Sequence, residues 1–206
     1  MMNYPTKEQA EKIWQDGIDY SREHHTKSPQ IDKEYIFHTR GVAEFSALLA
    51  KKMGLNQDKA YVLGLLHDYG KRIDEKRSDK FHGIVGYEDL MEYGYPDVAK
   101  ICLTHTFKEK TFHNEEYSYP SHWLDECRQL LSNITYDDYD RIVQYADMFF
   151  EGMNITSLEN RIAGITQRYK LNKTQEQSLS NGVFKLKKYI DDKCGCDSYE
   201  VLGIKR

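Results

Sequence analysis

The sequence has little of what secreted, membrane-spanning or strongly nucleic-acid-binding proteins require. Only four of its 206 residues are cysteines, too few for a disulfide framework. No segment approaches the ~18 consecutive apolar residues that a membrane span needs, and the start, MMNYPTKEQAEKIW, has no apolar signal core. The formal net charge of −4 gives no overall attraction for a polyanion. We therefore expect a reduced, cytoplasmic protein with no membrane association and no extended nucleic-acid surface.

Apolar residues recur at helical spacing along most of the chain. In residues 7–24, for example, Ala10, Trp14 and Ile18 fall on one helical face. No convincing period-two alternation interrupts this pattern, so we predict an all-α protein. The predicted helices cover residues 7–24, 38–53, 57–69, 82–93, 96–107, 121–132, 137–151, 156–170 and 173–191.

The length of the chain, residues 1–206, fits a single domain. We expect the core within about residues 36–150, with the first helix and the helices at 156–191 packed on it. Residues 70–80 read as a charged loop, and residues 108–137 fit the helical pattern least well. The tail, CGCDSYEVLGIKR at residues 194–206, is expected to be loosely held.

Several polar residues lie on the apolar stripes of these helices. His38 extends the stripe of residues 42–49 backwards by one turn. His67 and His105 each follow an apolar stripe at helical spacing, and Asp147 lies four residues after Val143. Because residues three and four apart share a helical face, these side chains are predicted to point into the core rather than to water.

Buried carboxylates are the most informative of these residues. A lone histidine on an apolar face is more often a hydrogen-bonded core residue than a metal ligand. Aspartate, however, is almost never fully buried unless it is paired or bound to a metal. Asp68 and Asp147 lie in such settings, and the surrounding helices supply few basic partners. A divalent cation would satisfy these groups together, since iron, manganese, zinc, nickel and cobalt all accept imidazole and carboxylate ligands.

Three segments, FHTRGVAEFSALLA, GLLHDYGK and VQYADMFF, resemble the sequence pattern of the HD-domain superfamily of metal-dependent phosphohydrolases. The resemblance covers about residues 36–150. It implies an HD-domain helical bundle with additional C-terminal helices. It also implies a divalent metal held by an H…HD…D set of ligands, which here corresponds to His38, His67, Asp68 and Asp147.

Two further segments, FHGIVGYEDL and ICLTHTF, add His82 and His105 between the HD pair and the last aspartate. HD proteins with two extra histidines in this region often hold a second metal, so the resemblance implies that both are ligands of a second ion. The layout is similar to that of the small bacterial symmetrical dinucleoside-tetraphosphate hydrolases, which are di-iron enzymes acting on diadenosine tetraphosphate. Residues 108–137 and the C-terminal region depart from that pattern.

The expected activity is the hydrolysis of a phosphoester or phosphoanhydride of a nucleotide-like substrate by metal-activated water. Asp68 is the candidate bridging ligand. Lys71, one turn later, is a candidate for neutralising charge on the substrate phosphate, and Arg40 is a second candidate for binding phosphate. The expected partner is a small phosphorylated molecule, and a homodimer is compatible with the sequence.

Two other functions stay open from the sequence. A non-catalytic sensor that keeps the HD ligands would bind metal and nucleotide without turnover. An HD-type di-iron oxygenase would consume oxygen. The complete set of six candidate ligands favours the hydrolase, because a sensor needs no activated water.

Overall fold

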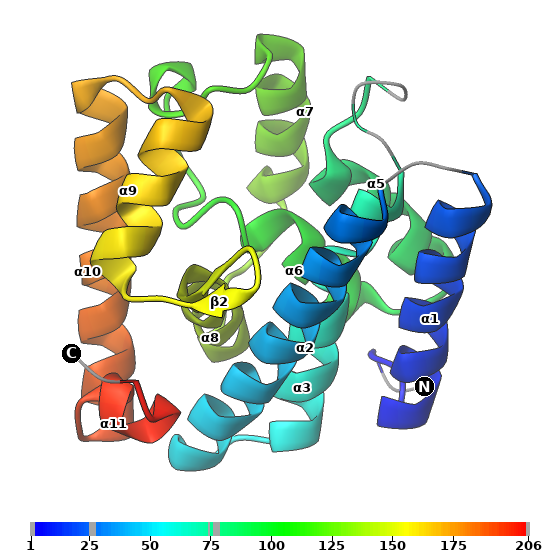
Figure 1. The fold of residues 1–206 in the computed structure, drawn as a ribbon, viewed down its shortest axis with the longest axis horizontal. Helices are drawn as coiled ribbons and strands as arrows, with labels where there is room; N and C mark the ends of the chain where they lie inside the picture. Colours follow the sequence, from blue (N-terminus) through cyan, green and yellow to red (C-terminus); the bar gives the residue numbers. More distant parts are fainter. Residues whose placement is uncertain (1–2, 25–27, 74, 76–78, 205–206) are drawn as a thin grey trace.

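The computed structural model describes residues 3–24, 28–73, 75 and 79–204, which are predominantly helical (Figure 1). The all-α prediction is confirmed. The helices are α1 (Lys7–Glu23), α2 (Pro29–Lys52), α3 (Gln57–Leu66), α5 (His82–Glu92), α6 (Pro96–Thr104), α7 (Ser121–Ser132), α8 (Asp138–Ala146), α9 (Leu158–Tyr169), α10 (Lys173–Cys194) and α11 (Ser198–Leu202), with the 3₁₀ turns η1 (Tyr69–Arg72), η2 (Asn114–Glu116) and η3 (Asp147–Phe149). Strands β1 (Phe150–Glu151) and β2 (Asn154–Ile155) pair antiparallel.

Side-chain caps define where several helices begin. The backbone N–H of Gln9 donates to the Thr6 hydroxyl, and the Thr6 N–H donates to the Gln9 side chain. Asp137 and Asn172 start α8 and α10 by the same reciprocal pattern. These capping boxes satisfy N–H groups that the first helical turn leaves unpaired.

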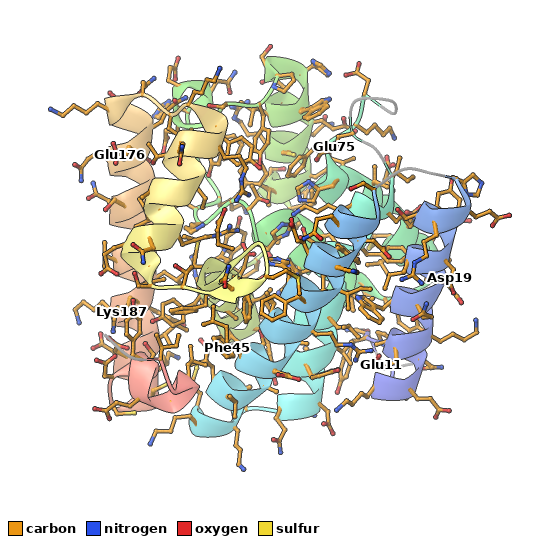
Figure 2. The ribbon with its side chains drawn as sticks, in the orientation of Figure 1. Glu11, Asp19, Phe45, Glu75, Glu176 and Lys187 are labelled. Atoms are coloured by element: carbon orange, nitrogen blue, oxygen red, sulfur yellow. The ribbon has the colours of Figure 1, made fainter. Side chains whose placement is uncertain are left out.

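The paired helices α2 and α3 form the centre of the molecule (Figure 1). Helix α1 packs against α3, and α8 packs against both α2 and α3. Phe45 points into the interior, whereas Asp19 and Glu176 lie on outer faces (Figure 2). A second, smaller apolar cluster connects α5, α6 and α7, and it includes Phe81, Leu103, Phe107, Trp123 and Leu124. This apolar cluster and the main core around α2 and α3 together hold the helix ends that converge on the site described below.

The C-terminal region is folded onto this core. Helix α10 packs on α8 and α9, and α11 packs on α2. Ser198 is fully buried and its hydroxyl lies 2.7 Å from the Tyr145 hydroxyl, while Tyr199 and Leu202 are also buried. The prediction of a loosely held tail is therefore wrong for residues 194–204, because the five residues of α11 are too few to show a periodic pattern.

Two predicted helix boundaries also differ from the structure. Helix α2 begins at Pro29 rather than at residue 38, since a proline in the first turn has no N–H that would need a partner. The helix predicted over 137–151 ends at Ala146 and gives way to η3 and the two-residue strand β1. A strand this short shows no detectable alternation in sequence. Among the described residues, no helix combines the length and the apolar character needed to cross a bilayer. The single-domain assignment stays a prediction.

Candidate metal centre

Four side chains from α2 and from the carboxyl ends of α3 and α8 meet in one place, which we call the first cluster. His38 Nε2 lies 3.2 Å from His67 Nε2 and 3.5 Å from Asp68 Oδ2. Asp147 Oδ1 lies 3.0 Å from His38 Nε2 and 3.8 Å from His67 Nε2. The structure thus brings together the four residues of the H…HD…D pattern, and the donor atoms of His38, His67 and Asp68 lie close enough together to share one cation.

A second cluster adjoins the first and consists of Asp68, His82 and His105. Asp68 Oδ1 lies 3.4 Å from His82 Nε2 and 3.3 Å from His105 Nε2. The two imidazole nitrogens are 3.3 Å apart. These three donor atoms could also hold a cation. All six candidate ligands from the sequence therefore lie in two clusters that share Asp68.

Asp68 connects the clusters through its two carboxylate oxygens and is 1% exposed. Its Oδ2 faces the first cluster and its Oδ1 faces the second. Oδ1 is buried without a hydrogen-bond partner among the described residues. Because an unsatisfied buried polar atom costs about 1–3 kcal/mol, and a charged one more, a cation bound beside this oxygen would stabilise it. Imidazole and carboxylate donors on both sides of it fit divalent metals.

The candidate ligands lie where helices end. Helix α3 ends at Leu66, so Asp68 has left the helical backbone and has a φ of −104°. His105 and Asp147 likewise follow the last residues of α6 and α8. The helices predicted over 57–69 and 96–107 are therefore shorter than expected. The change of backbone direction lets His67 and Asp68 face one point, although neighbours on a regular helix diverge by ~100°.

The far ring nitrogens of two candidate ligands are held by backbone carbonyls outside the clusters. His67 Nδ1 lies 2.7 Å from the carbonyl oxygen of Gly64, and His105 Nδ1 lies 3.1 Å from that of Ile101. A proton on each Nδ1 leaves the Nε2 lone pair free for a metal. Such outer hydrogen bonds are typical of metal-binding histidines, because they fix both the tautomer and the ring orientation.

The protonation states of these groups also suit metal binding. Burial opposes the charge on Asp68, but Lys71 and the neighbouring imidazoles hold the pKa of this carboxyl well below its usual range. Burial opposes ionisation of Asp147 as well, yet its hydrogen bond with His38 leaves the pKa of Asp147 well below normal. Burial lowers the pKa of His38, and it lowers that of His105 to about 4. Burial opposes the charge on His67 as well, but the Asp68 carboxylate raises the pKa of His67 overall. Charged carboxylates and neutral imidazoles are the forms that coordinate metals, and both aspartates, His38 and His105 favour these forms.

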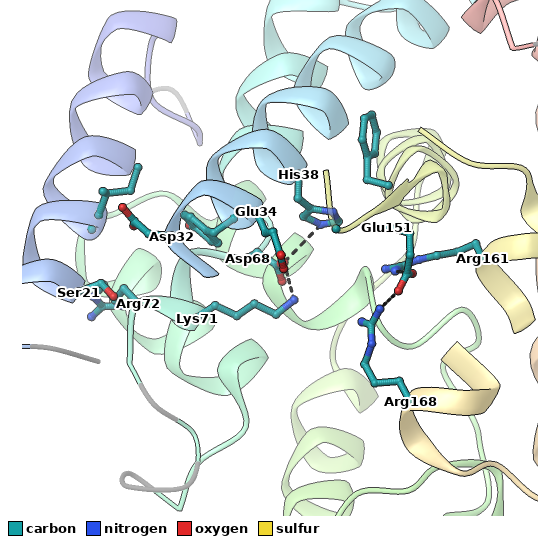
Figure 3. A pocket seen from close by; sticks show the side chains of 15 residues that line it. Ser21, Asp32, Glu34, His38, Asp68, Lys71, Arg72, Glu151, Arg161 and Arg168 are labelled. Carbon is teal, nitrogen blue, oxygen red and sulfur yellow. Dashed lines mark hydrogen bonds and ion pairs between the residues drawn. The ribbon is translucent and has the colours of Figure 1, made fainter. Parts of the chain in front are cut away.

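Lys71 lies at the edge of the first cluster. Its Nζ is 2.6 Å from Asp68 Oδ2, and its side chain is 42% exposed (Figure 3). Burial opposes the charge on Lys71, but the Asp68 carboxylate raises its pKa. The ammonium group is therefore charged at neutral pH and reaches both the centre and the open space in front of it.

Arg40 lies elsewhere. Its Nη1 pairs with Glu11 at 2.5 Å and with the Tyr61 hydroxyl at 2.9 Å, and its guanidinium stacks over Trp14 at 4.2 Å from the ring centroid. Arg40 lines neither of the two cavities described below. Because its polar atoms serve the contact between α1 and α2, we do not retain Arg40 as a phosphate ligand.

Two cavities adjoin the candidate metal centre. The larger, of about 520 Å³, reaches the first cluster from the side of α1 and α2 (Figure 3). The smaller, of about 250 Å³, reaches the second cluster. Lys71, Arg161 and Arg168 line both cavities. Aromatic residues form part of the wall of the smaller cavity: Phe112, Tyr117, Tyr119 and Tyr169. The centre therefore has room for substrate groups on two sides.

Sequence reasoning missed one residue that supports the second cluster. Glu75 Oε1 lies 2.5 Å from His82 Nδ1 and accepts a hydrogen bond from the His82 N–H at 2.9 Å. Burial opposes the charge of Glu75, but the contacts with His82 lower its pKa to about 2. In the sequence, Glu75 is one of many charged residues in a loop, and no spacing rule connects it with the start of α5.

Sequence reasoning also missed the cations of the C-terminal region. Arg161 and Arg168 lie on α9 and contact Glu151 from β1. The seven-residue spacing of the two arginines, which places them two turns apart on one side of a helix, was an available signal. Nothing in the sequence connects that side of α9 with the metal centre.

Comparison with known proteins agrees with this arrangement. The model of the HD domain family matches residues 35–150. The chain is 40% identical over 76 residues to ribonuclease Y from Fervidobacterium nodosum, which covers 36% of this chain and 14% of that protein. It is 36% identical over 74 residues to ribonuclease Y from Thermotoga maritima, a match that covers 35% of this chain and 14% of that protein. It is also 36% identical over 77 residues to ribonuclease Y from Mycoplasma capricolum, a match that covers 36% of this chain and 15% of that protein.

The chain thus spans about one seventh of the length of these curated relatives. No solved structure matches it. The family match extends over more than half of the chain, from just before His38 to just after Asp147, and so includes all six candidate metal ligands. The chain therefore belongs to the HD domain family.

Proposed function

We propose that this protein is a metal-dependent phosphohydrolase that cleaves a phosphoester or phosphoanhydride of a nucleotide-like substrate. The observation that carries the proposal is the position of Asp68. One buried carboxylate oxygen faces each histidine cluster, and Oδ1 has no hydrogen-bond partner among the described residues. Membership of the HD family supports the same reaction class.

The donor set fits one or two divalent ions. His38, His67, Asp68 and Asp147 would hold the first ion, and Asp68, His82 and His105 the second. Nitrogen and oxygen donors of this kind suit iron, manganese, zinc, nickel or cobalt. Such ions, when bound, polarise a phosphoryl oxygen and lower the pKa of a coordinated water towards ~7.

Lys71 is the residue that we assign to the substrate phosphate. Its ammonium group now pairs with Asp68 Oδ2 at 2.6 Å. When Asp68 is engaged in metal binding, this ammonium is available to donate to a phosphoryl oxygen at the mouth of either cavity. A fixed positive charge beside the phosphate stabilises the additional negative charge of the transition state. Asp68 and Lys71 thus cooperate, Asp68 by positioning the ions and Lys71 by contacting the substrate.

The smaller cavity favours a small nucleotide as the substrate. Its aromatic wall offers ring faces for stacking with a nucleobase, and the ring centroids of Tyr119 and Tyr169 are 6.4 Å apart. The cavity volume of about 250 Å³ suits a single nucleoside better than a nucleic-acid chain. The net charge of −4 also disfavours an extended polyanion. A dinucleoside polyphosphate would place one nucleoside in each cavity.

RNA is the second candidate substrate. The matching relatives are named as ribonucleases, and the similarity to them covers 74–77 residues, about a third of this chain. A short single-stranded RNA would present one phosphodiester to the metal centre. We therefore include RNA beside small nucleotides in the test of the substrate.

The proposal is tested by a substrate screen with metal-loaded protein. Nucleotides, dinucleoside polyphosphates, phosphomonoesters and a short RNA are each incubated with wild type, His67→Ala and Asp68→Asn. His122→Ala, which removes a histidine whose side chain is 60% exposed, is the matched control. We expect hydrolysis by wild type and the control, and a loss of at least 100-fold in both cluster variants, as is typical when an electrostatic element of a site is removed. Unchanged turnover in either cluster variant would refute the proposal, and metal and nucleotide binding without any turnover would favour the sensor.

A further inference from the structure

Two arginines outside the matched family region lie at the junction of the two cavities. Arg161 and Arg168 are seven residues apart on α9, which places them two turns apart on one side of the helix. Both line the larger and the smaller cavity, together with Lys71. Lys71 and Arg168 reach towards the same space from different elements (Figure 3). The C-terminal helices thus bring two guanidinium groups to the metal centre.

Both guanidinium groups pair with the same carboxylate. Arg161 Nη1 donates to Glu151 Oε2, and Arg168 Nη2 pairs with Glu151 Oε1. The Arg161 side chain is only 11% exposed, and its Nε is buried without a hydrogen-bond partner among the described residues. One carboxylate therefore leaves part of the donor capacity of this arginine pair unused.

The positive charge around this pair exceeds what Glu151 balances. Lys108 lines the smaller cavity, and it has no carboxylate within 4.0 Å among the described residues. Burial and the nearby charge of Arg161 lower the pKa of Lys108. Glu109, Glu116 and Asp147 also line the smaller cavity. Glu109 pairs with Lys185, and Glu116 accepts a hydrogen bond from Ser178, so Glu151 is the carboxylate that pairs directly with the two arginines. An additional anion here would therefore find unused donors and favourable charge.

A phosphate group has the right shape for this position. The planar fork of arginine binds carboxylate and phosphate oxygens in the same bidentate geometry, so the Glu151 carboxylate occupies the place that two phosphate oxygens would take. Glu151 lies on a two-residue strand beside the turn at Gly152 and is 30% exposed. Rotation of its side chain towards solvent would free both arginines without unfolding a helix.

We propose that Arg161 and Arg168 form a subsite for a second phosphate group of the substrate, and that Glu151 occupies this subsite until that phosphate displaces it. The inference rests on the proposed function, because the first phosphate is the one cleaved at the metal centre. The substrate class is then a compound with directly linked phosphates, such as a nucleoside polyphosphate. A simple phosphomonoester has no second phosphate, so Glu151 would remain in the subsite.

Equilibrium binding tests this subsite without requiring turnover. Inorganic tripolyphosphate and inorganic phosphate are titrated calorimetrically into metal-loaded wild type, Arg168→Gln and Glu151→Gln. Lys12→Gln, which removes an exposed cation paired with Asp16 on α1, controls for the loss of one positive charge. We expect tripolyphosphate to bind about tenfold or more weakly to Arg168→Gln, because a charge-assisted hydrogen bond is lost. Glu151→Gln should bind it several-fold more tightly, because the competing carboxylate is gone.

Affinity for single phosphate should change less than about threefold in both variants, because it needs only the metal centre. Unchanged tripolyphosphate affinity in both variants, or equal changes for phosphate and tripolyphosphate, would overturn the subsite. A short RNA is titrated in parallel. If the two substitutions change the affinity for RNA but not that for tripolyphosphate, the assignment of the subsite to linked phosphates is overturned. If wild type binds tripolyphosphate through these residues yet hydrolyses no phosphoester, the proposed function fails while the subsite stands.

Discussion

Gly70→Ala is expected to damage the metal centre through the backbone. Gly70 follows the HD pair by two residues and packs against the first turn of α5. A Cβ at this position would lie 1.9 Å from the carbonyl oxygen of His82 and 2.7 Å from the backbone nitrogen of Gly86. Neither atom belongs to a flexible side chain, so η1 and α5 must move apart.

The size of the effect follows from these distances. Bringing the new Cβ even to 3.0 Å from the His82 oxygen requires a displacement of at least 1.1 Å. Metal–ligand distances tolerate only about ±0.2 Å, and Asp68 and His82 lie on the two sides of the displaced contact. The second cluster should therefore lose its ion. Overpacking of this kind costs about 1–3 kcal/mol, which for a chain of this length lowers Tm by about 2–12 °C.

Differential scanning calorimetry and elemental analysis measure the two consequences. Gly182→Ala is the matched control, because its new Cβ would meet only Lys108 Cδ at 3.5 Å, an ordinary contact. Since Gly182 lies within α10, that substitution should stabilise the protein by up to about 1 kcal/mol. A Gly70→Ala protein with the wild-type Tm and the wild-type metal content would refute the reasoning.

Three further predictions concern the clusters. Glu75→Ala should weaken metal binding at the second cluster by about 10–100-fold, because His82 loses the acceptor that orients it. In chelator competition the first cluster should keep its metal affinity, and equal weakening at both clusters would contradict this role of Glu75. Asp68→Asn should lose metal from both clusters, whereas His105→Gln should lose it from the second cluster alone. An Asp68→Asn protein that still binds two ions per chain would show that the clusters do not share Asp68. In metal-free protein, burial lowers the pKa of His105 from 6.5 to about 4. The unfolded chain therefore binds the proton more readily, and the free energy of unfolding should fall as the pH drops from about 6.5 to about 4. Urea titrations should show a smaller fall for His105→Gln, and an equal fall would contradict the assigned shift.

The convergence of the candidate metal ligands was predictable because most of these residues obey helical periodicity. Histidines at 38, 67 and 105 lie on apolar stripes that were identified from spacing alone, and the structure places their imidazoles at the convergence of the helices. The pair His67 and Asp68 added a chemical signal, since burial of an aspartate demands a partner. The helix ends at these residues were not predicted, because nothing local marks them: α3 ends without a glycine or proline.

The residues around the centre were not predictable by the same means. Glu75 reaches His82 from a loop, and Glu151 reaches Arg161 from a two-residue strand, so neither contact follows a periodic spacing. Arg40 illustrates the opposite error. It lies two residues after His38 in the sequence, but on a helix this places the two side chains on different faces, and Arg40 pairs with Glu11 instead.

The most direct test of the account is the location of metal in crystals of protein purified without added metal. Elemental analysis first identifies the ion, and anomalous scattering at its absorption edge then locates it. The account predicts anomalous density on both sides of the Asp68 carboxylate, one peak bound by His38, His67 and Asp147 and the other by His82 and His105. Metal-free protein with ordered histidines, or density at a place that Asp68 does not reach, would contradict it.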